Sequence, residues 1–250
     1  MHRFYLPPEQ CQSDPLVLTG SQAHHAADVL RLKPSESVAV LDGAGGEFLC
    51  RVSSVEQKKI HLDVETLISE PAPACRITLA QAIPKGQIFD SIVQKATELG
   101  VWRVVPLLSE RVTTRLEGEA AERKREKWRQ TAVEAIKQCG QRWLPRIETP
   151  VALAAWLKAG ETFEMSLLGS LEEDRRHARE HFAAFERRWQ RRPASVCVWI
   201  GPEGDFAPAE VGAIRQSGAL PITMGPLILR SETAATFALS IINYELQAPW

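Results

Sequence analysis

The spacing of hydrophobic and polar positions changes near residue 70, and this change divides the chain into two predicted regions. Residues 1–68 contain short runs in which apolar and polar residues alternate, a pattern typical of half-buried β-strands. The run 38–48, VAVLDGAGGEF, predicts a β-hairpin, and a short helix is expected over 23–30. The proline-containing stretch 69–75, SEPAPAC, is typical of a linker. We therefore expect a small, barrel-like β domain over residues 1–70.

Beyond the linker, apolar runs of strand length alternate with segments of helical periodicity. The first predicted helix ends before Gly100, as expected of a C-cap glycine. The predicted strands are 77–80, 103–108, 165–168, 196–200 and 220–224, and the predicted helices are 88–99, 120–139, 172–189, 208–216 and 232 to the end. Because strands that alternate with helices form parallel sheets, we expect an α/β domain over residues 76–250.

Composition excludes several classes of protein. The chain has 250 residues and a formal net charge of −1, so no global charge indicates nucleic acid. Its five cysteines are scattered and include no Cys-x-x-Cys pair, which argues against a disulfide framework and against a zinc site. The N-terminus, MHRFYLPPEQ, lacks the apolar core of a signal peptide, and no run reaches membrane-spanning length. We expect a cytoplasmic protein without a metal ion.

The distribution of charge is more informative than its sum. Basic residues concentrate in the segments 111–129 and 175–192, and the second contains seven arginines against two glutamates. Such segments are either solvated helix faces or surfaces that follow RNA phosphates. Trp128 and Trp189 beside them are suited to stacking on bases. Both interpretations remain open at this stage.

One stretch near the C-terminus, SVCVWIGPEGDFAPAEVGAI, combines a buried strand, a Gly-Pro turn and a helix start. Gly201 and Gly204 permit backbone conformations closed to other residues, and Pro202 stiffens the turn. Pro208 then occupies the first turn of a helix, with Glu210 placed favourably for the helix dipole. This arrangement is either an ordinary tight turn or a ligand site at the carboxyl end of a strand.

A second Gly-Pro loop follows the next predicted strand, in MGPLILRSETAATFALSIINYEL. An extended segment separates Gly225-Pro226 from the last helix, for which Ser231 is the predicted N-cap. Backbone groups of the two loops should converge at one edge of the sheet. Neither loop is a Walker motif, and no G-x-G-x-x-G follows a strand, which disfavours ATPases and dinucleotide enzymes.

Several motifs in this order resemble the RsmE family of ribosomal RNA small-subunit methyltransferases. They are IGPEGDF with the following A-x-E, MGPLILRSETA, PKGQIFDSIVQKATELGV, LLSER and AVEAIKQCG, together with HRFYL, VLRLK and LDGAGGEF in the N-terminal region. The resemblance covers essentially the whole chain. It implies a PUA-like, RNA-binding β-barrel followed by an α/β methyltransferase domain of the SPOUT class with a C-terminal deep trefoil knot.

The resemblance also implies a homodimer that uses S-adenosyl-L-methionine to methylate N3 of uridine 1498 in 16S ribosomal RNA, on the small ribosomal subunit. Glycines and backbone groups of three loops would hold the cofactor. The implied cofactor-binding residues are Leu168, Gly169, Ile200, Gly201, Pro202, Glu203, Gly204, Met224, Gly225, Pro226, Leu227, Ile228, Leu229, Thr233 and Ala234.

Methylation at N3 of uracil requires loss of a proton or stabilisation of the anionic base. Arg230 is our first candidate for the stabilising cation, with a salt bridge to Glu232 as its alternative role. Glu232 and Glu98 are candidate proton acceptors, although each could be an ordinary helix charge. Candidate RNA-binding residues are Arg3, Arg31, Lys95, Arg111 and Arg142. We expect the helix that carries Lys95 and Glu98 and the Ser-Glu-Arg loop that carries Arg111 to reach the same cleft.

Two positions depart from the family pattern. Asp205 stands where the family usually has glycine, and Leu227 stands where it often has arginine. These departures keep open an RNA-binding assembly factor with a vestigial pocket. An enzyme acting on a small nucleotide is a further alternative, but it would need neither the basic segments nor the extra β domain.

Overall fold

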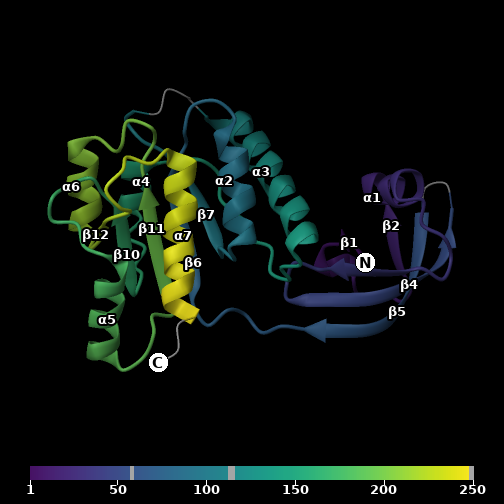
Figure 1. Cartoon of the computed structure of the whole chain (residues 1–250). Coiled ribbons are helices and arrows are strands. Elements are labelled where there is room, and N and C mark those ends of the chain that lie inside the picture. The colour runs from purple at the N-terminus through teal and green to yellow at the C-terminus, as the bar shows by residue number, and fades with distance from the viewer. Residues whose placement is uncertain (57–58, 112–115, 248–250) are drawn as a thin grey trace. The chain divides into compact units, whose positions relative to one another are not determined.

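The structure, a computed structural model, describes residues 1–56, 59–111 and 116–247. The chain forms two compact units, Met1–Ala72 with Val133–Leu144, and Pro73–Ala132 with Pro145–Trp250 (Figure 1). Residues 133–144 therefore belong with the N-terminal unit, which the hydrophobic pattern does not indicate. No helix in the described ranges is long and apolar enough to cross a membrane.

The N-terminal unit is built on a five-stranded sheet. In spatial order its strands are β1 (His2–Tyr5), β3 (Ser37–Leu41), β4 (Gly46–Val55), β5 (Lys59–Ser69) and β2 (Leu16–Thr19). Strands β3 and β4 pair antiparallel, with Leu41 opposite Glu47, which confirms the predicted hairpin. The short elements are η1 (Pro8–Gln10), α1 (Gly20–His24) and the π-helical η2 (His25–Val29). The last two together span residues 20–29, where a helix over 23–30 was predicted.

Two apolar clusters hold this unit together. Phe4, Leu18 and Val40 are fully buried inside the sheet. On its other side, Tyr5 and Leu41 pack against Val133, Ile136 and Leu144 of the segment 133–144. The segment thus supplies apolar surface that the N-terminal residues do not supply themselves.

The second unit contains a parallel sheet, as predicted. Its spatial order is β12 (Leu220–Ile222), β10 (Met165–Gly169), β11 (Ser195–Ile200), β6 (Arg76–Ala82), β7 (Arg103–Leu108) and β8 (Arg146–Ile147), while β9 (Val151–Ala152) also pairs with β7. Strand β11 is buried, because strands lie on both of its sides and helices on both of its faces. A short apolar run rich in β-branched residues suits this position.

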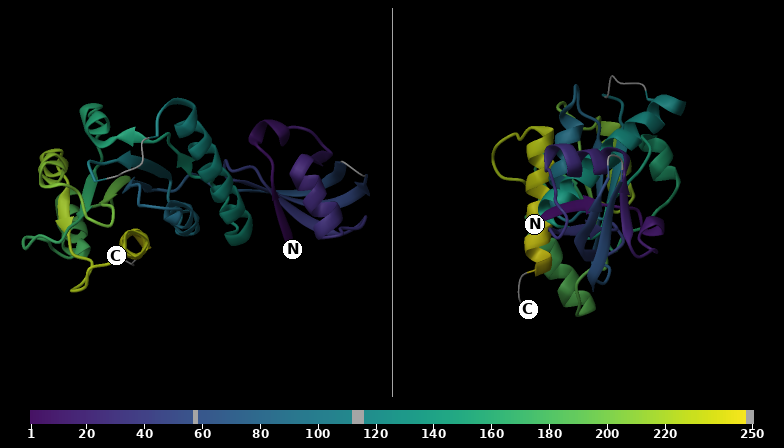
Figure 2. Two further views of the ribbon diagram at one scale, coloured as in Figure 1. Left: turned by 90° about the horizontal axis from the view of Figure 1, so that it is seen from above. Right: turned by 90° about the vertical axis from the view of Figure 1, so that its right-hand side faces the viewer.

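Helices cover both faces of this sheet. They are α2 (Ile88–Glu98), α3 (Gly118–Cys139), α4 (Leu153–Lys158), α5 (Ala178–Trp189), α6 (Pro208–Gln216) and α7 (Ser231–Gln247). Leu153 of α4 and Ile214 of α6 pack on one face with Trp199. Helices α2 and α7 contact each other on the opposite face, as the view from above in Figure 2 shows.

Helix α2 illustrates how closely local pattern and structure agree. Its apolar stripe, including Ile92, Val93 and Ala96, is buried. Gly100 has φ 72°, and its N–H donates to the Thr97 carbonyl while the Val101 N–H donates to that of Ala96. These two bonds form a Schellman motif, so the predicted glycine C-cap is confirmed.

The prediction for α5 was wrong at its start, since the helix begins at Ala178 and not at residue 172. Upstream, the Arg176 backbone pairs with strand β12: its N–H donates to Pro221, and its carbonyl accepts from Thr223. The Glu180 carboxylate then accepts the His177 N–H at 3.2 Å, which marks the new helix start. Tertiary pairing therefore overrides the helical pattern of residues 172–177.

Candidate functional site

Three loops leave the carboxyl ends of the neighbouring strands β12, β10 and β11 and enclose a cavity of about 70 Å³. Ligands in α/β proteins bind outside the carboxyl ends of strands, where loops converge. The cavity is lined by Gly169, Ser170, Leu171, Ile200, Gly201, Pro202, Glu203, Asp205, Met224, Gly225, Leu227, Ile228, Leu229, Ser231 and Ala234. Convergence of the two Gly-Pro loops is therefore confirmed by the geometry.

Most residues that the family resemblance assigned to the cofactor line this cavity. Leu168, Gly204, Pro226 and Thr233 were assigned but do not line it. Ser170, Leu171, Asp205 and Ser231 line it but were not assigned. Each of these four residues lies in or next to an assigned loop. The sequence therefore indicated which loops form the cavity, but not which of their side chains line it.

The Gly201–Asp205 turn folds tightly on itself. A Cβ atom at Gly201 would lie 2.6 Å from Asp205 Oδ1 and 3.1 Å from the Phe206 nitrogen. Any side chain at residue 201 would therefore force the turn or the Asp205 side chain to shift, whether or not a ligand is bound. Asp205 has φ 60°, and its carboxylate accepts the Phe206 N–H at 2.7 Å.

Glycine adopts the left-handed backbone of Asp205 freely, which fits the glycine that the family resemblance led us to expect at this position. Aspartate is among the few other residues that adopt this conformation, because its side chain bonds locally. Its side chain is half-buried on the cavity wall. Burial is the main cause that raises the pKa of Asp205, while the Phe206 N–H and Arg111 act in the opposite direction.

Two buried side chains join the turn to the last helix. Ser231 Oγ donates to the Gly201 carbonyl at 2.8 Å and accepts from Gln81 Nε2 at 2.9 Å. Gln81 Nε2 also lies 2.9 Å from the Ala82 carbonyl. Ser231 was predicted to be a helix N-cap, and this prediction was wrong, because its hydroxyl is used by the loop and the helix already includes it.

Loops from the neighbouring strands brace the same turn. Glu203 accepts the Lys85 N–H at 3.0 Å from the loop after β6. Arg111 Nη1 donates to the Gly204 carbonyl from the loop after β7. The prediction that the Ser-Glu-Arg loop reaches this cleft is therefore confirmed.

Comparisons with known proteins agree with this geometry. A model of the RNA methyltransferase domain matches residues 70–243, and a model of the RNA methyltransferase PUA domain matches residues 18–65. Ribosomal RNA small subunit methyltransferase E of Synechocystis is 30% identical over 99% of this chain and 78% of its own length. The chain belongs to the ribosomal RNA small subunit methyltransferase E family. The resemblance seen in the sequence motifs is confirmed.

Other members of the methyltransferase E family cover the chain equally well. The protein of Bacillus subtilis is 28% identical over 99% of this chain and 98% of its own. The crystal structure of the Neisseria gonorrhoeae protein, bound to S-adenosyl methionine, is 25% identical and covers 97% of this chain and 96% of its own, with a TM-score of 0.83. The two units are thus a PUA-type domain and an α/β RNA methyltransferase domain.

Within this methyltransferase E fold, Arg230 and Glu232 flank Ser231 where α7 begins. Arg230 is exposed, and its carbonyl accepts the Ala234 N–H at 2.8 Å. Glu232 is half-buried. No ion pair joins these two residues, so the salt bridge considered as the alternative role of Arg230 is absent.

Glu98 and Lys95 lie away from this cavity. The expectation that they reach the same cleft is therefore wrong for a single copy of the chain. The Leu99 carbonyl accepts from Asn243 Nδ2 near the end of α7, about 18 Å along that helix from Ser231. Helix α2 runs back from the carboxyl edge of the sheet, so its end lies at the amino edge. There Lys95 Nζ pairs with Glu98 at 2.9 Å.

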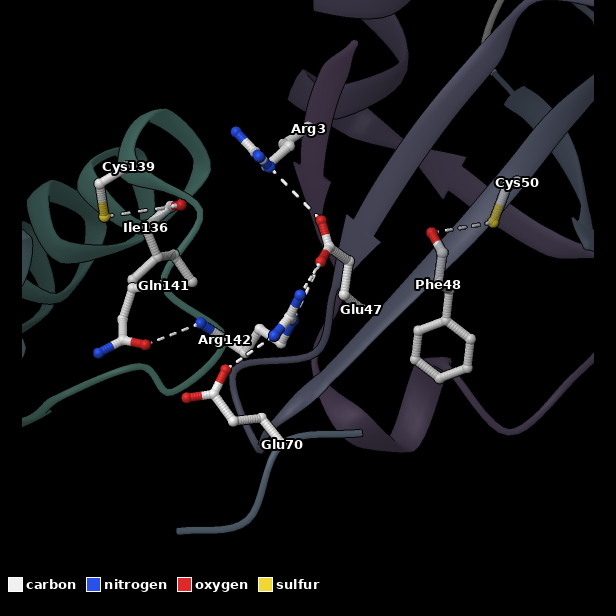
Figure 3. Close-up of polar contacts among 9 residues, drawn as sticks. All are labelled: Arg3, Glu47, Phe48, Cys50, Glu70, Ile136, Cys139, Gln141 and Arg142. Atoms are coloured by element: carbon white, nitrogen blue, oxygen red, sulfur yellow. Dashed lines mark hydrogen bonds and ion pairs between the residues drawn. The ribbon is translucent and has the colours of Figure 1, made fainter. Parts of the chain in front are cut away.

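Arg3 and Arg142, two candidate RNA-binding residues, both contact a buried carboxylate within the N-terminal unit (Figure 3). Arg142 reaches Glu47 at 2.7 Å and Glu70 at 2.8 Å, while Arg3 Nε lies 3.5 Å from Glu47. The hydrogen bonds that Arg142 donates to Glu47, and then those to Glu70, raise the pKa of Arg142. Arg31 differs from both, because it is exposed and makes no ion pair among the described residues.

The arginines around the start of α5 divide in the same way. Arg175 Nη1 donates to the carbonyls of Leu171 and Glu172 at 2.5 and 2.6 Å, so it stabilises a loop that lines the cavity. Arg179 is exposed on α5. Among the described residues, no cluster of three histidine, cysteine or acidic side chains could hold a metal ion.

Proposed function

We propose that this protein transfers a methyl group from S-adenosyl-L-methionine to N3 of uridine 1498 in 16S ribosomal RNA. The observation that carries the proposal is the cavity formed by three loops at adjacent strand ends. The Neisseria gonorrhoeae relative, of closely similar fold, is bound to S-adenosyl methionine. The names of the curated relatives support the small-subunit ribosomal RNA as substrate.

The residues of the cavity suit this cofactor chemically. Ile200, Leu227 and Leu229 offer apolar surface for an adenine ring, and Gly225 has φ 99° with open space where a side chain would begin. Glu203 and Asp205 provide acceptors for hydroxyl or ammonium groups. When bound, the cofactor supplies an electrophilic methyl group on a sulfonium.

The size of the cavity adds a requirement. Its volume of about 70 Å³ is far below the roughly 300–1,000 Å³ of usual ligand sites. Leu227 and Ile228 are 72% and 80% exposed, although both are apolar and belong to the wall. We infer that the segment 227–229 moves outward to admit the cofactor and buries these side chains against it.

The chain's own residues at the start of α7 suit the remaining chemistry. Arg230 lies one residue beyond the cavity loop and has no carboxylate partner among the described residues, so it is available to stabilise a uracil oxygen. The half-buried Glu232 is the nearby candidate to accept the N3 proton. Glu98 would need to come from a second copy of the chain, because α2 ends at the far edge of the sheet.

We also propose the deep trefoil knot of the SPOUT class, formed by the C-terminal segment of the domain over 76–250, and a homodimer. The knot is supported by the path of the chain after β12. It returns to α7, whose first residue, Ser231, donates a hydrogen bond to the Gly201 carbonyl in the turn after β11.

The dimer is supported by apolar side chains on α7, since Phe237 is 40% and Tyr244 72% exposed. The PUA-like domain over 1–70 would bind RNA, with Arg31 among its available cations. Because the substrate is ribosomal, we place the protein in the cytoplasm.

Mass spectrometry of 16S ribosomal RNA nucleosides tests the reaction. Cells lacking the gene should lose N3-methyluridine, wild type should restore it, and Arg230→Ala should not, provided that the variant retains its unfolding temperature. An unchanged level in the deletion strain would reject the proposal. Calorimetry with S-adenosyl-L-methionine then distinguishes an enzyme for another RNA site, which binds it, from an assembly factor with a vestigial pocket, which does not.

A further inference from the structure

A second cavity of about 620 Å³ lies beside the first residues of β10 and β12, at the edge of the sheet opposite the three loops. Its walls come from α4 and the loop after it, from α5, and from the turn between α6 and β12. The volume is typical of sites for small molecules. The proposed methyl transfer uses none of its residues.

Two groups of aromatic rings line this cavity. Trp156, Phe163 and Trp199 form one group, with the Trp156 and Trp199 ring centroids 4.6 Å apart. Phe185 and Trp189 of α5 form the other, with centroids 6.3 Å apart. Trp189 is 52% exposed, which is unusual for so large an apolar surface. Such aromatic groups suit a planar ring that stacks on one of them.

The acidic side chains that line the cavity are paired with arginines outside it, and one arginine of the lining is left to bind an anion. Glu164 is bound by Arg191 through two contacts of 2.7 Å, and Glu161 is bound by Arg103 at 2.5 Å. Arg188 lies on the cavity wall with its guanidinium 5.0 Å from the Trp189 ring centroid. Among the described residues it has no carboxylate partner. A cation beside an exposed indole is the combination that binds a base and its phosphate.

We propose that this cavity binds a nucleotide, with its base stacked on Trp189 and Phe185 and its phosphate at Arg188. The nucleotide is either a residue of a single-stranded RNA or a free mononucleotide, since both present the same chemistry. Helix dipole stabilisation alone would also favour arginines at the end of α5. Arg187 shares that position but does not line the cavity, so it is the matched control.

The experiment uses the full-length protein and probes that contain neither adenine nor uracil, so that the proposed cofactor and substrate sites are not involved. Cytidine 5′-monophosphate and cytidine are titrated by calorimetry, and a fluorescein-labelled decamer of cytidylate is titrated by anisotropy. The variants are Arg188→Gln, Trp189→Ala, Trp189→Phe and the control Arg187→Gln. Far-UV circular dichroism and unfolding temperature show that each variant is folded.

Three results are expected. Arg188→Gln weakens binding of the monophosphate and decamer several-fold but not that of cytidine, and it lowers the salt slope of the decamer by about one. Trp189→Ala weakens all probes about tenfold, and Trp189→Phe restores most of the loss. Arg187→Gln leaves the monophosphate unaffected.

The relative affinities identify the source of the nucleotide. A decamer bound at least tenfold more tightly than the monophosphate identifies RNA, and similar affinities identify a free nucleotide. The proposal is overturned if neither probe binds, or if Arg188→Gln and Arg187→Gln have equal effects. Because the readout is binding at this cavity, its outcome is independent of whether the protein methylates uridine.

Discussion

Gln81 and Ser231 are joined by a hydrogen bond of 2.9 Å in the interior of the methyltransferase domain. Gln81 is fully buried on β6, and Ser231 is the first residue of α7. The same hydroxyl donates to the Gly201 carbonyl at 2.8 Å. This chain of two bonds fixes the Gly201 turn and the start of α7 to the centre of the sheet.

Replacing Ser231 with alanine should therefore affect both stability and cofactor binding. The change leaves the Gly201 carbonyl and the Gln81 amide without these partners, which costs about 1–3 kcal/mol of unfolding free energy. We expect a raised KM for S-adenosyl-L-methionine as the turn loosens. Urea unfolding and methyl-transfer kinetics measure the two effects.

Ser240→Ala is the matched control, because Ser240 is exposed on the same helix and its hydroxyl bonds, within the described part of the chain, only to the Thr236 carbonyl. Its effect should stay within about 0.5 kcal/mol. Equal losses in the two variants would show that the link between Gln81 and Ser231 has no special role.

Substitutions of Asp205 should reveal the backbone requirement of the turn. Asp205→Ala forces alanine to φ 60° and removes the bond to the Phe206 N–H, so we expect a loss of about 1–2 kcal/mol. Asp205→Gly should cost much less and retain methyl transfer. A glycine variant that loses activity while remaining folded would instead assign the carboxylate itself a role in binding.

Glu164 should make stability depend on acid pH. Hydrogen bonds from Arg191, then from the Ala194 N–H, lower the pKa of Glu164 from 4.5 to about 2. The folded state thus favours the charged carboxylate, so its contribution is complete above pH 4.5 and is lost as the pH falls towards 2. Wild type should lose more stability than Glu164→Gln across this window in urea unfolding.

Glu119→Gln serves as the control for this pH effect, since the Glu119–Arg123 pair is exposed and contributes little. Wild type and Glu119→Gln should have parallel pH profiles. If Glu164→Gln also runs parallel to wild type, the contact between Glu164 and Arg191 does not stabilise the fold in solution.

Arg142→Ala should destabilise the N-terminal unit. Glu47 is only 6% exposed and would keep Arg3, at 3.5 Å, as its remaining cation. We expect a loss of about 2–3 kcal/mol, less than for a fully buried pair because Arg142 is partly exposed. Thermal unfolding measures it, and Arg51→Ala, which breaks the exposed pair with Glu65, should cost less than about 1 kcal/mol.

The sequence predicted features that depend on residues close together in the chain or on the order of its strands and helices. The apolar run 196–200 became β11, and Gly100 ends α2, because both depend on local burial or backbone geometry. The Gly-Pro loops converge because parallel strands end at one edge. Ser231 was misassigned because its partners, Gly201 and Gln81, lie far away in sequence.

Two other errors have different origins. The position of Glu98 follows from topology, since a helix after a parallel strand must run back to the amino edge, and it was available from the predicted order of elements. The ion pairs of Arg142 were not available, because they require that residues 133–144 join the N-terminal unit. A basic residue in a sequence gives no indication of which carboxylate it contacts.

Helix α3 contributes its residues to both compact units, since Val133 and Ile136 pack on Tyr5 and Leu41. During synthesis the ribosome releases residues 1–72 long before residue 144. The N-terminal unit therefore cannot complete its packing as the first segment to emerge, contrary to the usual order in which domains fold. A fragment cut at the linker would lack the same helix end, and with it the side chains that pack on Tyr5 and Leu41.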